Sequence, residues 1–287
     1  MNHIFWHNGN LIAGKTLELA IDDPGLLYGA TVFTTLRVYD GNLDLPKTNW
    51  LAHLRRLSSS LQSFDWQMPN WERVRQGAEI LKQHYPVLRI TIFPDGREWI
   101  TGRSLPADLT ERQEYGIAAW GAERGEWARS RSVASAVSLP SNKTGNYLSP
   151  WLALQQAQKH GAKEAILVDA SGNWLETSTG NLWGWRDGRW WTPPVAAGIL
   201  PGLMREQLIN RLHSQNEKVG EEPWTPDFVA GLEALAYSNS VVEIVPIQTI
   251  ISSSTAGEQE KMPITHYPPS LAKIASLTQS VANSEIS

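Results

Sequence analysis

The chain has 287 residues, of which 41% are hydrophobic and 19% are charged, a globular composition that can bury one large core or two of ordinary size. Its formal net charge of −4 gives no reason to expect nucleic acid or an anionic membrane as a partner. The absence of cysteine excludes disulfides, thiolate metal sites and a cysteine nucleophile.

No targeting segment is expected. The first residues, MNHIFWHNGN, lack the basic start and the long apolar run of a signal peptide. No stretch approaches the roughly 20 apolar residues of a membrane span. We therefore expect a soluble, cytoplasmic protein.

The N-terminal third predicts strands joined by tight turns. HNGN at 7–10 indicates a hairpin between two short apolar runs. Residues 31–45 alternate apolar and polar side chains around Asp40 and Gly41, which predicts a second hairpin. Residues 87–93, VLRITIF, predict a further strand.

Two amphipathic helices are predicted between these strands. In residues 48–64 the apolar positions follow a helical period, and four leucines are expected to share one face: Leu51, Leu54, Leu57 and Leu61. Residues 70–85 predict a second helix, ended by Pro86.

The middle of the chain changes character. Residues 101–113 are polar, contain a proline and show no sustained period, so they are interpreted as a connector. A strand is predicted at 115–120, followed by a polar loop and extended chain at 128–140. The sequence therefore predicts an N-terminal domain over residues 1–110 and a C-terminal domain over residues 111–287.

The C-terminal region alternates helices with antiparallel hairpins. The predicted elements are a helix at 147–161, hairpins at 164–176 and 181–193, a helix at 201–215 and a strand–turn–strand unit at 234–247. The tail at 252–261 is typical of a linker, and residues 268–280 suggest a short helix. The expected fold class is mixed α/β (α+β), with hairpins in place of βαβ units.

Common catalytic signatures are absent. The sequence contains no GxSxG, HExxH or GxxxxGK[ST] motif. Its seven histidines do not cluster at metal-ligand spacing. These absences argue against a Ser-His-Asp hydrolase and against a metal site.

The segment SNKTGNYLSP, residues 141–150, contains Lys143 among small and turn-forming residues. A lysine that fixed backbone holds in a dry pocket has a lowered pKa and can form a Schiff base. An ordinary loop lysine in water would have the same local sequence. This segment taken alone leaves both interpretations open.

Three further segments contain residues that could bind a ligand but that also have an ordinary structural interpretation. Glu176 is followed by four small residues, so its carboxylate can face a cavity, although a turn or cap glutamate would look the same. In GILPGLMREQ, 198–207, Gly and Pro lead into a helix whose first N–H groups can cradle a phosphate. The turn YSNS, 237–240, could add further donors.

A lysine for an imine, a carboxylate for a ring nitrogen and a helix N-terminus for a phosphate are together what pyridoxal phosphate requires. Their order resembles the class IV aminotransferases, the fold-type-IV pyridoxal-phosphate enzymes. That family includes branched-chain aminotransferases, D-amino-acid aminotransferases and 4-amino-4-deoxychorismate lyases. The resemblance runs from about residue 22 to 247 and is carried by LLYGATVFTTLRVYDG at 26–41, HLRRL at 53–57, KTGNYL at 143–148, EAILVDASGNWLETSTGNLW at 164–183 and GILPGLMRE at 198–206.

The resemblance implies a role for each matching residue. Lys143 matches the Schiff-base lysine, and Glu176 matches the carboxylate that keeps the pyridine nitrogen protonated. Arg56 matches the arginine that grips the phosphate, to which its planar fork is suited. Without the resemblance, Arg56 would be an ordinary residue of an amphipathic helix.

Further positions match the phosphate side of the family's site. Leu203 and Met204 fall where the family offers backbone N–H groups to the phosphate, and Asn239 and Ser240 fall at a second phosphate-side turn. Tyr147 is similar to a tyrosine that contacts the cofactor's phenolic oxygen, but its spacing from the lysine differs by one residue. The resemblance also implies a homodimer with the cofactor between two domains and a small-molecule substrate.

Within the family, the sequence most resembles the deoxychorismate lyases. FTT followed by Arg37, the GLMRE segment and the asparagine-containing turn SNSVVEIVPI are closer to the lyases than to the branched-chain enzymes. The implied reaction forms 4-aminobenzoate and pyruvate for folate biosynthesis. Thr35, Arg97 and Arg103 are candidate substrate contacts. The alternatives are a transaminase that acts on branched-chain or D-amino acids, and a noncatalytic descendant that keeps the fold for binding.

Overall fold

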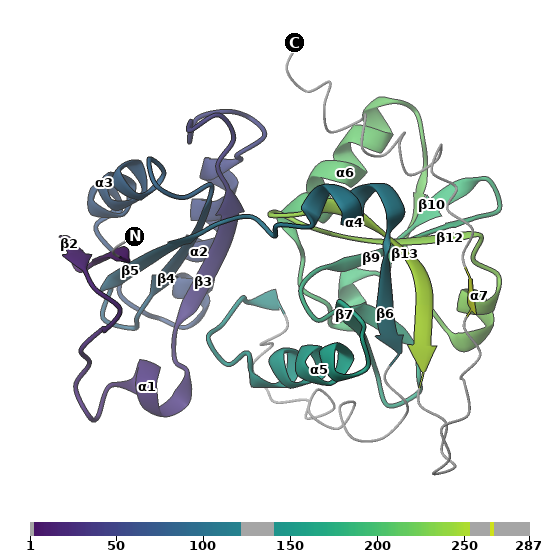
Figure 1. The fold of residues 1–287 in the computed structure, drawn as a ribbon, viewed down its shortest axis with the longest axis horizontal. Coiled ribbons are helices and arrows are strands. Elements are labelled where there is room, and N and C mark those ends of the chain that lie inside the picture. Colours follow the sequence, from purple (N-terminus) through teal and green to yellow (C-terminus); the bar gives the residue numbers. More distant parts are fainter. Residues whose placement is uncertain (1–2, 122–140, 253–264, 267–287) are drawn as a thin grey trace. The chain divides into compact units, whose positions relative to one another are not determined.

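The structure is a computed structural model that describes residues 3–121, 141–252 and 265–266. The chain forms two compact units, shown in Figure 1. Unit 1 comprises residues 1–107 and 142–147, and unit 2 comprises residues 108–141 and 148–286. Each unit has its own sheet.

Unit 1 is built on a five-stranded sheet in the order β2-β1-β5-β4-β3. Every pairing in it is antiparallel. The strands are β1 (Ile4–His7), β2 (Asn10–Ala13), β3 (Val32–Arg37), β4 (Val87–Ile92) and β5 (Glu98–Arg103). This order places β3 at an edge of the sheet.

Helices α2 (Trp50–Ser63) and α3 (Trp71–Leu81) lie along one face of this sheet (Figure 1). The core between sheet and helices is formed by alternate strand residues, such as Leu36, Ile90 and Ile100, which are fully buried. A one-turn helix, α1 (Pro24–Tyr28), precedes β3.

Two details of unit 1 differ from the sequence-based predictions. The predicted hairpin at 31–45 was wrong, because β3 pairs with the distant strand β4 and only an isolated bridge joins Tyr39 to Asn42. The predicted four-leucine face of the first helix was partly wrong, since Leu51 is 66% exposed whereas Leu57 and Leu61 are buried. Tertiary packing overrode the local pattern in both cases.

Unit 2 contains a sheet in the order β11-β10-β9-β12-β13-β6-β7-β8, with β14 paired to β13. Its strands are β6 (Ile117–Gly121), β7 (Glu164–Val168), β8 (Trp174–Thr177), β9 (Asn181–Arg186), β10 (Arg189–Trp191), β11 (Val219–Gly220), β12 (Ala234–Asn239), β13 (Glu243–Ser252) and β14 (Thr265–His266). Its helices are α4 (Leu109–Tyr115), α5 (Leu148–Lys159), α6 (Leu203–Ser214) and α7 (Pro226–Ala230), with a 3-10 turn at Val195–Ala197.

The predicted hairpins of the C-terminal region are confirmed by the antiparallel pairs β7–β8, β9–β10 and β12–β13. The predicted connector at 101–113 was wrong, because β5 extends to Arg103 and α4 begins at Leu109. The predicted polar loop and C-terminal helix, and all of the predicted linker except Ser252, lie outside the described residues.

The segment 142–147 belongs to unit 1 because its backbone extends the sheet beyond β3. Phe33 N donates to Lys143 O at 2.8 Å, and Gly145 N donates to Thr31 O at 2.7 Å. Lys143 therefore groups with residues 1–107, whereas the sequence analysis assigned it to the C-terminal domain. This grouping by contact does not test which segments fold independently, so the boundary at residue 110 stays a prediction.

The described helices are all too short or too polar to span a lipid bilayer. Among the same residues, no group of histidine, aspartate and glutamate side chains is arranged to hold a metal ion.

Candidate active site

Lys143 is held at the edge of the unit 1 sheet by the backbone bonds to β3 described above. Its Nζ lies 4.9 Å from the ring centroid of Phe33 and 5.1 Å from that of Tyr147. These two rings meet edge to face, with centroids 5.7 Å apart. Gly145 is required beside the lysine, since an added Cβ would lie 2.2 Å from Thr31 Oγ1. The lysine amine is thus presented by fixed backbone between two aromatic rings.

Arg56 approaches the same edge from helix α2. Its Nη2 donates to Thr34 Oγ1 at 2.5 Å, and its buried Nε has no hydrogen-bond partner. Burial lowers the pKa of Arg56 to about 10, and no described carboxylate forms an ion pair with it. A desolvated cation with an unused donor is costly unless an anion pairs with it. This arrangement fits a phosphate at Arg56.

The sheet face opposite α2 and α3 carries cationic side chains. Thr35 lies directly across from Arg89, in the same sheet row, and Arg37 and Arg103 both lie across from Val87. Since alternate residues share a face, these four side chains and Phe33 point to the same side. The Arg89 guanidinium lies 3.6 Å from the Phe33 ring centroid. Phe33 therefore contacts both Arg89 and Lys143.

Arg89 was missed in the sequence analysis. It has no hydrogen bond or ion pair with any described residue. Burial lowers the pKa of Arg89, the attraction of Tyr147 opposes this shift, and repulsion from Arg103 adds to it. Burial also lowers the pKa of Arg103. The signal that could have found Arg89 is its position: an arginine inside an apolar strand, VLRITIF, has to face a solvated or ligand-binding surface.

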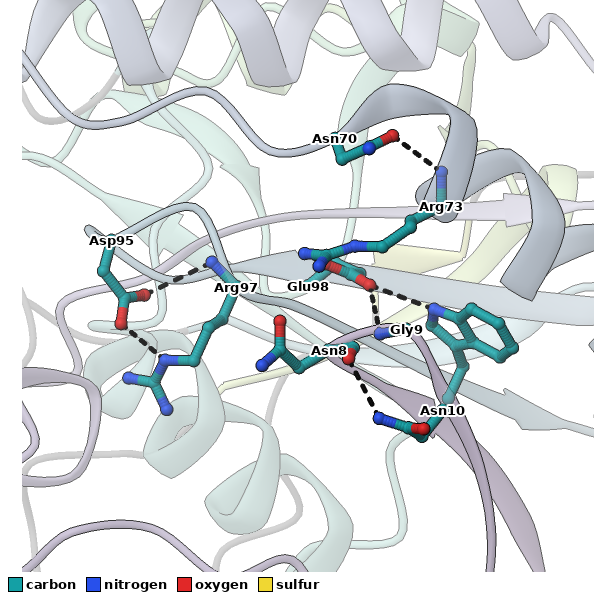
Figure 2. Close-up of polar contacts among 9 residues, drawn as sticks. Asn8, Gly9, Asn10, Asn70, Arg73, Asp95, Arg97 and Glu98 are labelled. Atoms are coloured by element: carbon teal, nitrogen blue, oxygen red, sulfur yellow. Dashed lines mark hydrogen bonds and ion pairs between the residues drawn. The ribbon is translucent and has the colours of Figure 1, made fainter.

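Arg97, a predicted substrate contact, lies in the turn between β4 and β5. Figure 2 shows its backbone N and Nε bonded to the Asp95 carboxylate, at 3.3 and 2.6 Å. Its Nη2 also pairs with buried Asp23 at 2.5 Å. It lines a cavity of about 410 Å³ with Arg73, which pairs in turn with Glu98. These carboxylates make Arg97 less suited to a substrate than Arg89 or Arg103.

In unit 2, Glu176 is buried on β8 and is fixed by the loop before α6. Its Oε2 accepts from Leu200 N at 3.1 Å and from Asn181 Nδ2 at 3.5 Å. Asn181 Nδ2 also donates to Leu200 O at 2.8 Å. Asn181, which the sequence analysis did not single out, therefore links the carboxylate to the chain that leads into α6.

Helix α6 begins at Leu203 with Gly202 as its N-cap, and no side chain caps it. Its first N–H groups, including those of Leu203 and Met204, have no partner within the helix. A Cβ at Gly202 would lie 2.0 Å from Asn181 Oδ1, so any other residue there would displace the Asn181 side chain. Arg205 anchors this first turn by pairing with Glu221 and Pro193 O. The start of α6 fits an anion such as a phosphate.

A second turn follows β12. The Asn239 side chain closes it, because its Oδ1 accepts from Val241 N and Val242 N at 2.9 and 3.0 Å. Asn239 Nδ2 donates to Thr179 Oγ1, which donates in turn to buried Glu164. Burial raises the pKa of Glu164, although hydrogen bonds from the hydroxyls of Ser178, Thr179 and Thr177 oppose the shift. Ser240 lies half-buried in this turn.

Each unit therefore gathers part of the predicted set. Unit 1 contains Lys143, Tyr147, Arg56 and Thr35, and unit 2 contains Glu176, Leu203, Met204, Asn239 and Ser240. The unit 1 group offers the Lys143 amine and the buried Arg56 guanidinium, and Arg89 and Arg103 lie in the same sheet. The unit 2 group offers a buried carboxylate and backbone donors.

Comparison with known proteins identifies the family to which the chain belongs. The sequence profile of the amino-transferase class IV family matches residues 31–250. The branched-chain-amino-acid aminotransferase of Escherichia coli strain K12 is 24% identical over 276 residues, covering 91% of this chain and 88% of that protein. The aminodeoxychorismate lyase of Vibrio harveyi is 22% identical over 262 residues, covering 86% of this chain and 91% of that protein.

Solved structures share the fold. A hypothetical aminotransferase from Mycobacterium tuberculosis in its PLP-bound form superposes with a TM-score of 0.75 at 18% identity, covering 97% of this chain and 98% of that one. A fold IV transaminase from Curtobacterium pusillum gives a TM-score of 0.73 at 21% identity, covering 97% and 99%. With a profile match over most of its length and this fold, the chain belongs to the amino-transferase class IV family.

Proposed function

We propose that this protein is a pyridoxal-phosphate enzyme that cleaves 4-amino-4-deoxychorismate to 4-aminobenzoate and pyruvate. Pyridoxal phosphate is the cofactor of this family, and the unpaired guanidinium Nε of Arg56 and the uncapped start of α6 fit its phosphate. The buried Glu176 carboxylate fits its ring nitrogen. Bound pyridoxal phosphate supplies an electron sink for negative charge on the substrate carbon that carries nitrogen.

The residues of the chain perform the remaining steps. Glu176 holds a proton on the pyridine nitrogen and is itself oriented by Leu200 N. Lys143 Nζ would act as the general base that removes the proton from the substrate carbon that bears nitrogen. The bond from the ring to the enolpyruvyl oxygen then breaks, and the ring becomes aromatic. Lys143 returns the proton to the departing three-carbon fragment, so that pyruvate forms and no oxidant is consumed.

The cationic sheet face is the observation that carries the choice of substrate. Aminodeoxychorismate has two carboxylates, and Arg89 and Arg103 stand on the same face as Phe33, over which Lys143 lies. Guanidinium groups bind carboxylates through paired hydrogen bonds. Arg89 has no carboxylate partner among the described residues, so it can serve a substrate. Thr35 lies beside Arg89 and offers a hydroxyl to the same ligand.

A transaminase is the second candidate. The similarity to branched-chain-amino-acid aminotransferases favours it, since one is 24% identical along 91% of this chain. Such an enzyme would use Lys143 and Glu176 in the same way, but would return the amino group to a keto acid. The two candidates therefore differ in whether an amino acceptor is needed.

The deciding experiment incubates the purified holoenzyme with aminodeoxychorismate and no keto acid. We expect 4-aminobenzoate and pyruvate to form in equal amounts. Lys143→Ala is the control, in which the rate should fall by about 10²- to 10⁴-fold because the general base is lost. Its visible cofactor band, which borohydride reduction should abolish in the wild type, is also expected to disappear. Deamination of a branched-chain or D-amino acid with no release of 4-aminobenzoate would reject the lyase.

We also propose that the protein works as a homodimer, as the family resemblance implies. The exposed apolar side chains within residues 21–28 support this, because Ile21 is 89% exposed and Tyr28 is 74% exposed in the single chain. The cytoplasmic location expected from the sequence stays a prediction.

A further inference from the structure

A buried histidine stands behind Arg56 and has no place in the reaction above. His53 lies on α2, three residues before Arg56, and is 1% exposed. Its Nδ1 lies 2.6 Å from Thr34 Oγ1, and Thr34 is fully buried. The same hydroxyl accepts from Arg56 Nη2 at 2.5 Å. His53, Thr34 and Arg56 thus form one hydrogen-bonded chain.

The direction of each bond in this chain follows from chemistry. A guanidinium only donates, so Thr34 Oγ1 is the acceptor toward Arg56. The single hydroxyl hydrogen of Thr34 then points to His53 Nδ1, which has to accept it. This requires a neutral ring with its proton on Nε2. Burial, followed by the charges of Arg56 and Lys143, holds the pKa of His53 well below its usual range and so keeps the ring neutral.

Arg56 has few other contacts that orient its guanidinium. Its Nε has no hydrogen-bond partner, and its Nη2 donates to Thr34 Oγ1 and to no other atom of the described residues. A hydroxyl that rotates freely would present a lone pair to Arg56 only part of the time. An acceptor at His53 Nδ1 removes that freedom.

We propose that His53 is a positioning residue for the cofactor phosphate: it fixes the Thr34 hydroxyl so that Thr34 orients the Arg56 guanidinium toward the phosphate. The inference rests on the proposed role of Arg56 as the phosphate ligand. His53 touches neither substrate nor cofactor and acts through Thr34. The alternative is that His53 only fills space beneath the helix.

Two substitutions at His53 separate these roles. Asparagine can place its amide oxygen where Nδ1 stands, so His53→Asn keeps the acceptor but leaves a cavity. His53→Leu fills the space better but removes the acceptor. If His53 only fills space, the leucine variant should bind pyridoxal phosphate more tightly than the asparagine variant. If His53 positions Thr34, the asparagine variant should bind it more tightly.

The measurement is the affinity of the apoenzymes for pyridoxal 5′-phosphate and for pyridoxal, which lacks the phosphate, followed by tryptophan fluorescence. We expect His53→Leu to weaken pyridoxal phosphate binding about tenfold, or about 1.4 kcal/mol, and to leave pyridoxal binding within about twofold. His53→Asn should bind both within about threefold of the wild type, although its melting temperature falls further than that of His53→Leu.

Thr34→Val tests the chain without altering the histidine. It should weaken pyridoxal phosphate binding as His53→Leu does, and the double variant should lose no more than either alone, because both act through one hydroxyl. The proposal is overturned if His53→Leu keeps the wild-type affinity, if it loses both ligands equally, or if His53→Asn is as weak as His53→Leu.

The variant Arg56→Met separately tests whether Arg56 binds the cofactor phosphate. It should weaken pyridoxal phosphate binding and spare pyridoxal. If both ligands bind to Arg56→Met as to the wild type, the assignment of the phosphate to Arg56 fails, whatever the His53 variants do.

Discussion

At the scale of single residues, Arg89 is the side chain whose role most depends on the proposed substrate. It stacks on Phe33 and pairs with no described carboxylate. We expect Arg89→Leu to lower kcat/KM for aminodeoxychorismate by about 10- to 100-fold, since a hydrogen bond to a charged group contributes about 1.5–3 kcal/mol. Steady-state kinetics should show the loss mainly in KM.

Arg97→Leu is the matched control for Arg89. Its guanidinium already pairs with Asp23 and Asp95, so its loss should alter stability more than substrate binding. If Arg97→Leu raises KM and Arg89→Leu does not, the two assignments have to be exchanged. Affinity for pyridoxal phosphate should be unchanged in both variants.

The sequence predicted the candidate site residues that stand in contiguous motifs, and it missed the candidates that strand pairing or a long-range hydrogen bond brings into place. Lys143, Glu176 and Arg56 each stand in a short recognisable segment. Arg89 is a candidate because the strand register places it across from Thr35. Asn181 is a candidate because its side chain donates to Leu200 O, 19 residues away. Neither relation can be read from local sequence.

At the scale of elements, the start of α6 depends on Gly202. A Cβ there would lie 2.0 Å from Asn181 Oδ1 and would push Asn181 away from Leu200 and Glu176. We therefore expect Gly202→Ala to weaken pyridoxal phosphate binding by about tenfold or more, as overpacking typically costs 1–3 kcal/mol. Fluorescence titration of the apoenzyme measures it.

The double variant Gly202→Ala/Asn181→Ala identifies the cause. If the loss comes from displacing Asn181, the double variant should bind pyridoxal phosphate no more weakly than Asn181→Ala alone. Losses that add would instead place the effect of Gly202→Ala in the helix cap itself, since alanine is a poorer N-cap than glycine.

Element prediction succeeded where turn residues fix the backbone. Asn8 and Gly9 both have positive φ in the β1–β2 turn, as do Asp187 and Gly188 in the β9–β10 turn, and both hairpins were predicted. Asp40 and Gly41 also have positive φ, but the chain after them forms turns and then α2. A turn sequence fixes a bend, and only a partner strand makes it a hairpin.

At the scale of the whole molecule, the sequence predicted two mixed α/β regions and included residues 142–147 in the second, whereas these residues group by contact with unit 1. That segment follows residues of unit 2 along the chain, yet its backbone bonds to Thr31 and Phe33. Such pairing joins positions more than 100 residues apart. The stability of this pairing depends on a sheet edge that exists only after folding, so no local sequence pattern predicts it.

The proposed homodimer makes a prediction of its own. Four apolar side chains, Ile21, Leu26, Leu27 and Tyr28, are each more than half exposed within one short segment. Such a patch favours burial against a second copy of the chain, because removing apolar surface from water contributes roughly 25 cal/mol per Å². We expect the wild type to sediment as a dimer, and Leu26→Asp/Leu27→Asp to shift it toward monomer at micromolar concentration.

Leu11→Asp is the control, since Leu11 is 48% exposed on β2 in the same unit but stands outside the segment. It should leave the dimer intact, because a charge on an exposed edge strand costs little. A monomeric wild type would end the dimer proposal. A dimer that survives the double substitution would mean that other surfaces hold it, because two buried aspartates without partners would cost several kcal/mol and could not be accommodated at the interface.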